Sequence, residues 1–183
     1  MAVADWSSTG CAIASSSAQY KVGAKSMRII SSATSWTIST TLAMGNLSAY
    51  TGVSTGHPSS GTVGLWIYCT ANTDITAISL RIGSSSGNYT VVSGVKPYTL
   101  STGTAAGFTC RAGWNYYVFI LKNGTETGTP NWASVAYAYV AFTGTNGVTN
   151  YADYLTIGTG DSIGLNGLGE RYETDGYSTL ATG

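Results

Sequence analysis

The residues able to do chemistry are few and widely spaced in this sequence of 183 residues. His57 is the only histidine, and it lies in a Ser-, Gly- and Pro-containing stretch that is typical of a surface loop. A catalytic histidine needs an orienting partner and a nucleophile, and no nucleophile-elbow pattern is present. The eight acidic residues are too sparse to nominate the carboxylate pair that glycoside hydrolysis requires. We therefore expect no catalytic residues and no enzyme activity.

One carboxylate occupies an unusual position. Asp153 interrupts the apolar, aromatic, strand-like run 151–157. A charge in such a strand must be exposed, hydrogen-bonded or bound to a metal ion. Calcium prefers carboxylate and carbonyl oxygens, so Asp153 is a candidate calcium ligand, and Asp5 near the start of the chain is a second candidate. The alternative is a hydrogen-bonded structural carboxylate, and we expect no cofactor other than this structural calcium.

The three cysteines, Cys11, Cys69 and Cys110, are an odd number with no metal-type spacing. Their positions in or near strand-like runs favour buried thiols of a protein made in a reducing compartment. A disulfide between Cys69 and Cys110 is the alternative.

The composition favours strands over helices. Only 9% of the residues are charged and no stretch resembles an amphipathic helix, whereas 13 Tyr and 5 Trp suit a sheet and 24 Gly suit its turns. Strand-like runs recur along the chain at 11–16, 26–32, 35–42, 63–70, 77–82, 89–93, 98–101, 115–121, 134–142 and 151–157. The sequence therefore predicts an all-β fold, an antiparallel two-sheet jelly-roll β-sandwich over residues 1–158.

Several of these runs alternate, which places one face on a core and leaves the other for solvent or a partner. Val63, Leu65, Ile67 and Cys69 share one face of their strand, and Gly64, Trp66 and Tyr68 share the other. Ile78, Leu80 and Ile82 are expected to face inward, with Ser79 and Arg81 outward. In 134–142, Val135, Tyr137 and Tyr139 lie opposite Ala136, Ala138, Val140 and Phe142. Trp66, Tyr68, Tyr137 and Tyr139 are therefore candidates for an interface or for stacking on a ligand, and the alternative is that they fill a large core.

From residue 159 the strand pattern fades. The stretch 159–183 is Gly-rich and has few apolar anchors, so we expect an extended tail or arm. Laid against a neighbouring subunit it would add to a sheet edge, with Leu165, Leu168 and Tyr172 as anchors. Together with the strands that are bulky on both faces, this indicates a homo-oligomer or a larger assembly.

Charge excludes some partners. Eight basic residues balance eight acidic ones and are scattered, so we expect no nucleic-acid binding. No apolar run is long enough to cross a membrane, and the start of the chain has no basic and apolar regions of a secretory signal, so we expect no membrane partner and synthesis in the cytoplasm.

A family resemblance rests on a series of short segments in order. They are WSSTGCAIAS (6–15), YKVGAKSMRI (20–29), LSAY (47–50), GLWIY (64–68), GWNYYV (113–118) and YADYLTI (151–157). Over residues 5–158 the chain resembles carbohydrate-binding-module-like jelly rolls of the concanavalin- or galactose-binding-like type, which are common in virion proteins of tailed phages. The resemblance implies the sandwich fold and places the family's strand-end Asp, sometimes a calcium ligand, at Asp153. No sugar-binding set of residues carries over from it.

Two functions follow as hypotheses. The first is a bacteriophage virion structural protein, made in the host cytoplasm without a signal peptide. It would be a capsid decoration or cement protein, or a tail or fibre component, with the major capsid or tail protein as its partner. The alternative is a carbohydrate-binding or host-receptor-binding module, which would bind glycan by stacking on aromatic side chains. Its pool of platforms is Trp36, Trp66, Trp114 and Trp132, of which at least two are expected in the core.

Overall fold

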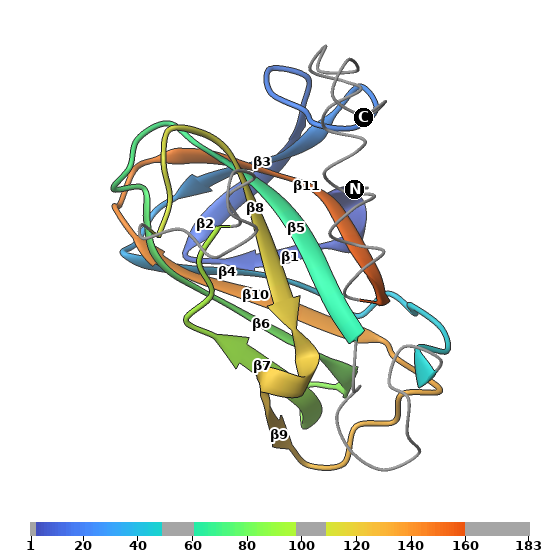
Figure 1. Ribbon diagram of the computed structural model, residues 1–183. Helices are drawn as coiled ribbons and strands as arrows, with labels where there is room; N and C mark the ends of the chain where they lie inside the picture. The colour runs from blue at the N-terminus through green and yellow to red at the C-terminus, as the bar shows by residue number, and fades with distance from the viewer. Residues whose placement is uncertain (1–2, 49–60, 98–108, 160–183) are drawn as a thin grey trace, which may run out of the picture.

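Two antiparallel β-sheets packed face to face make up the protein (Figure 1). The structure, a computed structural model, describes residues 3–48, 61–97 and 109–159. Helix is confined in these ranges to short 3-10 turns such as η1 (Val3–Asp5) and η3 (Leu121–Asn123), and none is long and apolar enough to cross a membrane. The predicted all-β sandwich is confirmed. The predicted strand at 98–101 and the predicted tail at 159–183 lie outside the described residues, apart from residue 159 itself.

The strands divide into a six-stranded sheet A and a five-stranded sheet B, and every neighbouring pair is antiparallel. Sheet A has the order β1 (Ser7–Thr9), β4 (Ser35–Thr40), β10 (Tyr137–Gly144), β6 (Ile75–Ser85), β7 (Asn88–Ser93) and β9 (Thr125–Thr127). Sheet B has the order β2 (Cys11–Ser16), β3 (Ser26–Ser31), β11 (Thr149–Thr159), β5 (Gly61–Cys69) and β8 (Gly113–Ile120).

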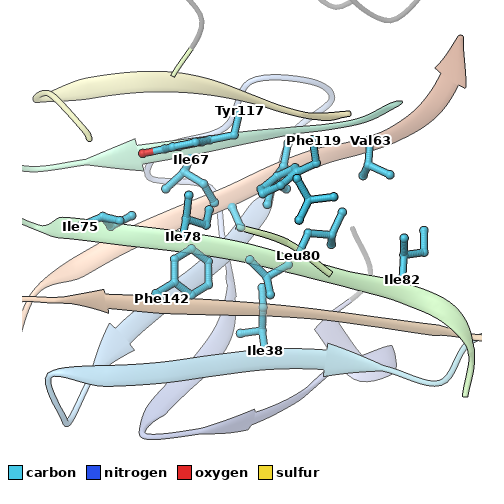
Figure 2. Packing of buried hydrophobic residues seen from close by; sticks show 14 of the residues in the cluster. Ile38, Val63, Ile67, Ile75, Ile78, Leu80, Ile82, Tyr117, Phe119 and Phe142 are labelled. Atoms are coloured by element: carbon cyan, nitrogen blue, oxygen red, sulfur yellow. The ribbon is translucent and has the colours of Figure 1, made fainter. Parts of the chain in front are cut away.

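The core lies between the two sheets and follows the alternation of the sequence. In β5 the predicted inward set of Val63, Leu65, Ile67 and Cys69 is fully buried, and in β6 the same holds for Ile78, Leu80 and Ile82. Figure 2 shows Ile78 and Leu80 of sheet A projecting toward Ile67 and Phe119 of sheet B. Removing this apolar surface from water is the main stabilising term of such a sandwich, and it fixes which side chains are left on the two outer surfaces.

Two strands were not predicted from the sequence. β1 and β9 have three residues each and form the two edges of sheet A. Three residues carry too little alternation to be recognised, and such short edge strands depend on the neighbour they pair with. β6 and β11 are also longer than their predicted runs, with eleven residues each.

Candidate functional site

Three tyrosines and one arginine meet on the outer surface of sheet A. The strand register places Tyr139 of β10 across from Arg81 of β6, and it places Tyr137 across from Gly83, which in turn faces Tyr89 of β7. Alternation puts all four side chains on the side away from the core. We call Arg81, Tyr89, Tyr137 and Tyr139 the tyrosine face.

Gly83 is what allows Tyr89 to approach Tyr137. The register of β6 and β7 shifts between Gly83 and Ser85, and β7 comes so close that a Cβ on Gly83 would meet the backbone of Asn88 and of Tyr89. Only a glycine tolerates that approach. With no side chain between them, the rings of Tyr89 and Tyr137 lie 6.1 Å apart, centroid to centroid, at an interplanar angle of 44°.

Arg81 is held in place by the tyrosines around it. Its guanidinium carbon lies 4.7 Å from the ring centroid of Tyr139 and 5.2 Å from that of Tyr89. Tyr137 and Tyr139 stack with centroids 6.4 Å apart and an interplanar angle of 21°. Cation–π and ring–ring contacts of this kind are each worth on the order of 1 kcal/mol, so the four side chains restrain one another.

The four side chains remain accessible to different degrees. Tyr137 is 8% exposed, whereas Arg81, Tyr89 and Tyr139 are half-buried. Burial raises the pKa of the Tyr137 hydroxyl, and the charge of Arg81 opposes that rise. The phenol therefore stays protonated at neutral pH and can both donate and accept a hydrogen bond.

Small polar side chains border the tyrosine face. Ser39 of β4 pairs with Tyr139, Ser7 of β1 pairs with Ser39, and Ser79 of β6 occupies the next outward row beside Ala141. That row lines a shallow depression of about 180 Å³, whose lining residues include Ala77, Ile78, Ser79, Ser93, Gly94, Ala141 and Thr143. The surface thus offers aromatic rings, one cation, hydroxyl groups and a hollow next to them.

The outer surface of sheet B also carries aromatic side chains, but its centre is covered. Trp66 and Tyr116 are each 1% exposed, with ring centroids 4.6 Å apart, and Trp114, Val118 and Tyr154 pack around them. We call these five residues the covered cluster.

The loop between β2 and β3 reaches Trp66 of the covered cluster. Lys21 in this loop is buried, and its Nζ lies 5.3 Å from the ring centroid of Trp66. The loop is fastened by Asp153, whose Oδ2 accepts hydrogen bonds from the backbone N–H of Lys21 at 2.7 Å and of Val22 at 3.0 Å. Asp153 Oδ1 accepts a third from the N–H of Tyr154 at 2.8 Å. The buried carboxylate is therefore an anchor for the loop.

The predicted calcium site has this same carboxylate at its centre. Both oxygens of Asp153 face backbone N–H donors, an arrangement that suits an anion acceptor and not a cation. Asp5 lies exposed in η1. Among the described residues no three His, Cys, Asp or Glu side chains gather in a way that could hold a metal ion. Calcium at Asp153 and Asp5 stays a prediction, and these residues do not supply a fitting donor set for it.

The other aromatic candidates are distributed over both sheets. Tyr68 is half-buried on the outer surface of sheet B, with its ring 5.5 Å from that of Trp114 and 5.8 Å from that of Tyr151. Trp36 and Trp132 belong to the core. Leu165, Leu168, Tyr172 and His57 lie outside the described residues. Of the predicted stacking candidates, the structure brings Tyr137 and Tyr139 together on one surface, and it places Trp66 under a loop.

Arg81 and Tyr89 were not among the predicted site residues. The alternation of β6 did place Arg81 outward, and Tyr89 began a predicted strand. What the sequence lacks is the register that sets residue 81 beside residues 89, 137 and 139, because β6 and β10 are far apart along the chain.

The cysteine pair has its own chemistry in the core. All three cysteines are free, and Cys69 and Cys110 are buried with their thiols hydrogen-bonded to each other. That hydrogen bond lowers the pKa of the Cys110 thiol to about 7 and raises the pKa of the Cys69 thiol. Because both sulfurs are buried, this pair is a packing feature and not a reactive surface site.

One further pocket lies at the edge between β7 and β8. Its volume is about 380 Å³, and Val92, Ser93, Gly94, Val95, Lys96, Val118, Ile120 and Asn123 line it. No aromatic ring is among the described residues that line this pocket, and Lys96 donates a hydrogen bond to Thr109 at 2.8 Å. The tyrosine face is therefore the better equipped of the two for recognition.

The comparisons with known proteins give matches among solved structures alone. No protein-family model matches it, and neither does any curated protein. Among solved structures, a family 11 carbohydrate-binding module from Clostridium thermocellum, in complex with a β-1,3-1,4-mixed-linked tetrasaccharide, matches with a TM-score of 0.52 and 11% identity over 82% of this chain and 86% of that one. The family 30 module of a Clostridium thermocellum cellulosomal cellulase matches with a TM-score of 0.52 and 14% identity over 86% and 87%.

A third match is described as a carbohydrate-binding module of promiscuous specificity from the β-sandwich superfamily. It has a TM-score of 0.49 and 11% identity over 83% of this chain, which spans 55% of the length of that one. At these identities the family 11 and family 30 modules, with TM-scores above 0.5, show the fold alone. This chain has the β-sandwich fold of carbohydrate-binding modules, as the resemblance of its sequence segments implied.

Proposed function

We propose that this chain is a non-catalytic carbohydrate-binding domain and that the tyrosine face binds the glycan. The observation that carries the proposal is the set of three tyrosine rings and one guanidinium, held together across β10, β6 and β7 on the outer surface of sheet A. A sugar ring presents an apolar C–H face and a rim of hydroxyl groups. Accessible tyrosines match both, because each combines an apolar ring with a hydroxyl group that pairs with polar partners.

The surroundings of the tyrosine face support this proposal. The hydroxyl groups of Ser39 and Ser79 lie beside the rings and can pair with sugar hydroxyls, and the depression of about 180 Å³ is large enough for one sugar ring. Fold alone does not imply function, so the proposal rests on these side chains, and the matched sandwiches make it more plausible as an analogy.

The carboxylates support a non-catalytic role. Asp74 and Asp153 are buried, and both accept several hydrogen bonds within the fold. The other described acids are Asp5 and Glu126. Asp5 lies two residues before the start of the edge strand β1, and Glu126 lies in the opposite edge strand β9. Five strand spacings separate these edges by roughly 24 Å, whereas glycoside hydrolysis needs carboxyls about 5–10 Å apart.

The virion role inferred from the resemblance stays a prediction, together with the capsid, tail and homo-oligomer partners. No contact of the described residues points to a particle, whereas the tyrosine face points to a glycan. Glycan binding is for this reason the function we put forward.

The proposal can be tested with a glycan array that includes neutral, uronic-acid and sulfated oligosaccharides. The array would be probed with the wild-type protein, Tyr139→Ala and Tyr68→Ala. Tyr68 is the matched control, because it is also a half-buried tyrosine but lies on sheet B. We expect Tyr139→Ala to lose about tenfold or more of the affinity, since stacked rings contribute on the order of 1–2 kcal/mol, and Tyr68→Ala to bind as the wild type does. Absence of binding across the array, or a loss confined to Tyr68→Ala, would refute the proposal.

A further inference from the structure

Arg81 is the only charged side chain that points outward from the strands of sheet A. The other outward residues are uncharged: Ser7, Thr9, Ser35, Thr37, Ser39, Ala77, Ser79, Gly83, Tyr89, Val91, Ser93, Thr125, Thr127, Tyr137, Tyr139, Ala141 and Thr143. Glu126 pairs with the buried Thr90 and so belongs to the opposite side of its strand. The described strands of this surface therefore present one localised positive charge.

No carboxylate pairs with Arg81 within the described parts of the chain. Its contacts there are the rings of Tyr89 and Tyr139. Asp74 and Asp153 accept their hydrogen bonds elsewhere. A half-buried cation between apolar rings has lost part of its hydration, and rings compensate less than an anion does. An anionic ligand would supply the missing counter-charge.

The geometry of Arg81 also suits an anion. The guanidinium carbon of Arg81 lies over the rings of Tyr89 and Tyr139, and these ring contacts do not use up its five N–H donors. These donors form a planar fork that fits the oxygens of a carboxylate or sulfate in a bidentate manner. Because the rings already restrain the side chain, little conformational entropy is lost when the ligand binds.

A sugar ring has a place beside this charge. The depression is lined by Ser79 and Ala141, which form the outward row next to that of Arg81 and Tyr139. A ring seated there would direct an acidic substituent at the guanidinium while its hydroxyl groups meet Ser79 and Ser93. The cation, the rings and the hollow thus belong to one surface.

We infer that the glycan bound by the tyrosine face carries a carboxylate or sulfate group, and that Arg81 is the residue that selects it. This inference rests on the proposed function, because it concerns the same surface. Carboxylate and sulfate both offer Arg81 two anionic oxygens that can accept parallel N–H bonds, so the experiment must distinguish the two groups.

The test uses pairs of probes that differ in charge alone. The first pair is a galacturonate oligosaccharide and its fully methyl-esterified form. The second is a κ-carrageenan oligosaccharide and its desulfated form. Isothermal titration calorimetry at low salt would compare the wild-type protein with Arg81→Gln and Arg81→Lys, and thermal melting would establish that the variants fold.

We expect one acidic probe to bind the wild type about tenfold or more tightly than its neutral counterpart, which corresponds to about 1.4 kcal/mol. Arg81→Gln should abolish that preference. Arg81→Lys should retain only part of it, because an ammonium lacks the fork. The preference should weaken with added salt. A preference within the galacturonate pair identifies carboxylate as the group recognised, and a preference within the carrageenan pair identifies sulfate.

Two outcomes overturn the inference and have different meanings. Equal affinity for charged and neutral probes, or a preference that persists in Arg81→Gln, would show that Arg81 does not select an acidic group. If Tyr139→Ala still abolishes binding in that case, the tyrosine face remains a glycan site. If none of the probes binds and the array is also blank, the glycan-binding function itself fails.

Discussion

The two outer surfaces of the sandwich carry similar side chains, but these are buried on sheet B and partly accessible on sheet A. Each has a pair of aromatic rings with a cation over one of them: Tyr137 and Tyr139 with Arg81 on sheet A, and Trp66 and Tyr116 with Lys21 on sheet B. On sheet B both rings are 1% exposed beneath a loop, and on sheet A most of the set remains half-buried. One arrangement works as a second, small core, and the other is available to a ligand.

The difference originates in Asp153. Its carboxylate fastens the loop between β2 and β3 through the N–H groups of Lys21 and Val22, and the loop covers Trp66. In the described residues, no loop is fastened over the tyrosine face by such an anchor. An aromatic side chain that alternates outward is therefore ambiguous until the loop above it is known.

The comparison would be most severely tested by removing one ring from each surface. Trp66→Ala should destabilise the protein by about 3–5 kcal/mol, because it leaves a cavity beneath the loop. Tyr139→Ala removes a half-buried ring and should cost about 1 kcal/mol or less. Urea denaturation of both variants provides the measurement. Similar losses of stability in the two variants would show that Tyr139 is a structural core residue, as Trp66 is, and not a residue left available to a ligand.

Local patterns in the sequence were sufficient for most of the fold. In β5 and β6, alternation correctly separated the residues that face the core between the sheets from those on the opposite face, because each strand has one face on that core. The same local rule placed Trp66, Tyr137 and Tyr139 outward but could not distinguish a covered ring from an accessible one. That distinction depends on a hydrogen bond between residues 132 positions apart, Lys21 and Asp153.

The candidate site was only half predictable for the same reason. Tyr137 and Tyr139 are two residues apart in one strand, so the sequence placed them together. Arg81 and Tyr89 join them through strand pairing, and the close approach of Tyr89 depends on the register shift at Gly83. Pairing between distant strands has no local signature in a single sequence.

The loop anchor gives the second largest expected effect. Asp153→Ala would leave three backbone N–H groups without their acceptor and should cost about 2–4 kcal/mol, since hydrogen bonds to a buried charge are strong and unpaired buried donors are costly. Asp153→Asn keeps an acceptor oxygen and should cost less. Near-wild-type stability of Asp153→Ala in urea denaturation would mean that the loop is held by other contacts.

Chelation decides the remaining question about Asp153. Because N–H donors face both of its oxygens, we expect EDTA to leave the melting temperature of the wild type unchanged. A fall in melting temperature that is present in the wild type and absent in Asp153→Ala would instead establish the predicted calcium site.

The two cations offer the finest distinction between the surfaces. Lys21 is buried above Trp66, and its charge is desolvated, so Lys21→Gln should cost up to about 2 kcal/mol of stability. Arg81 is half-buried among tyrosines, and Arg81→Gln should cost only about 0.5–1 kcal/mol. Glutamine removes the charge in each case and keeps the first two methylene groups of the aliphatic stem. Urea denaturation ranks the two variants by loss of stability and glycan titration ranks them by loss of affinity, and we expect the two rankings to be opposite. Lys21→Gln should lose more stability with its affinity unchanged, and Arg81→Gln should lose more affinity. If Arg81→Gln proves the less stable of the two, the arginine is a structural clamp of sheet A, and its selection of an acidic sugar loses its main support.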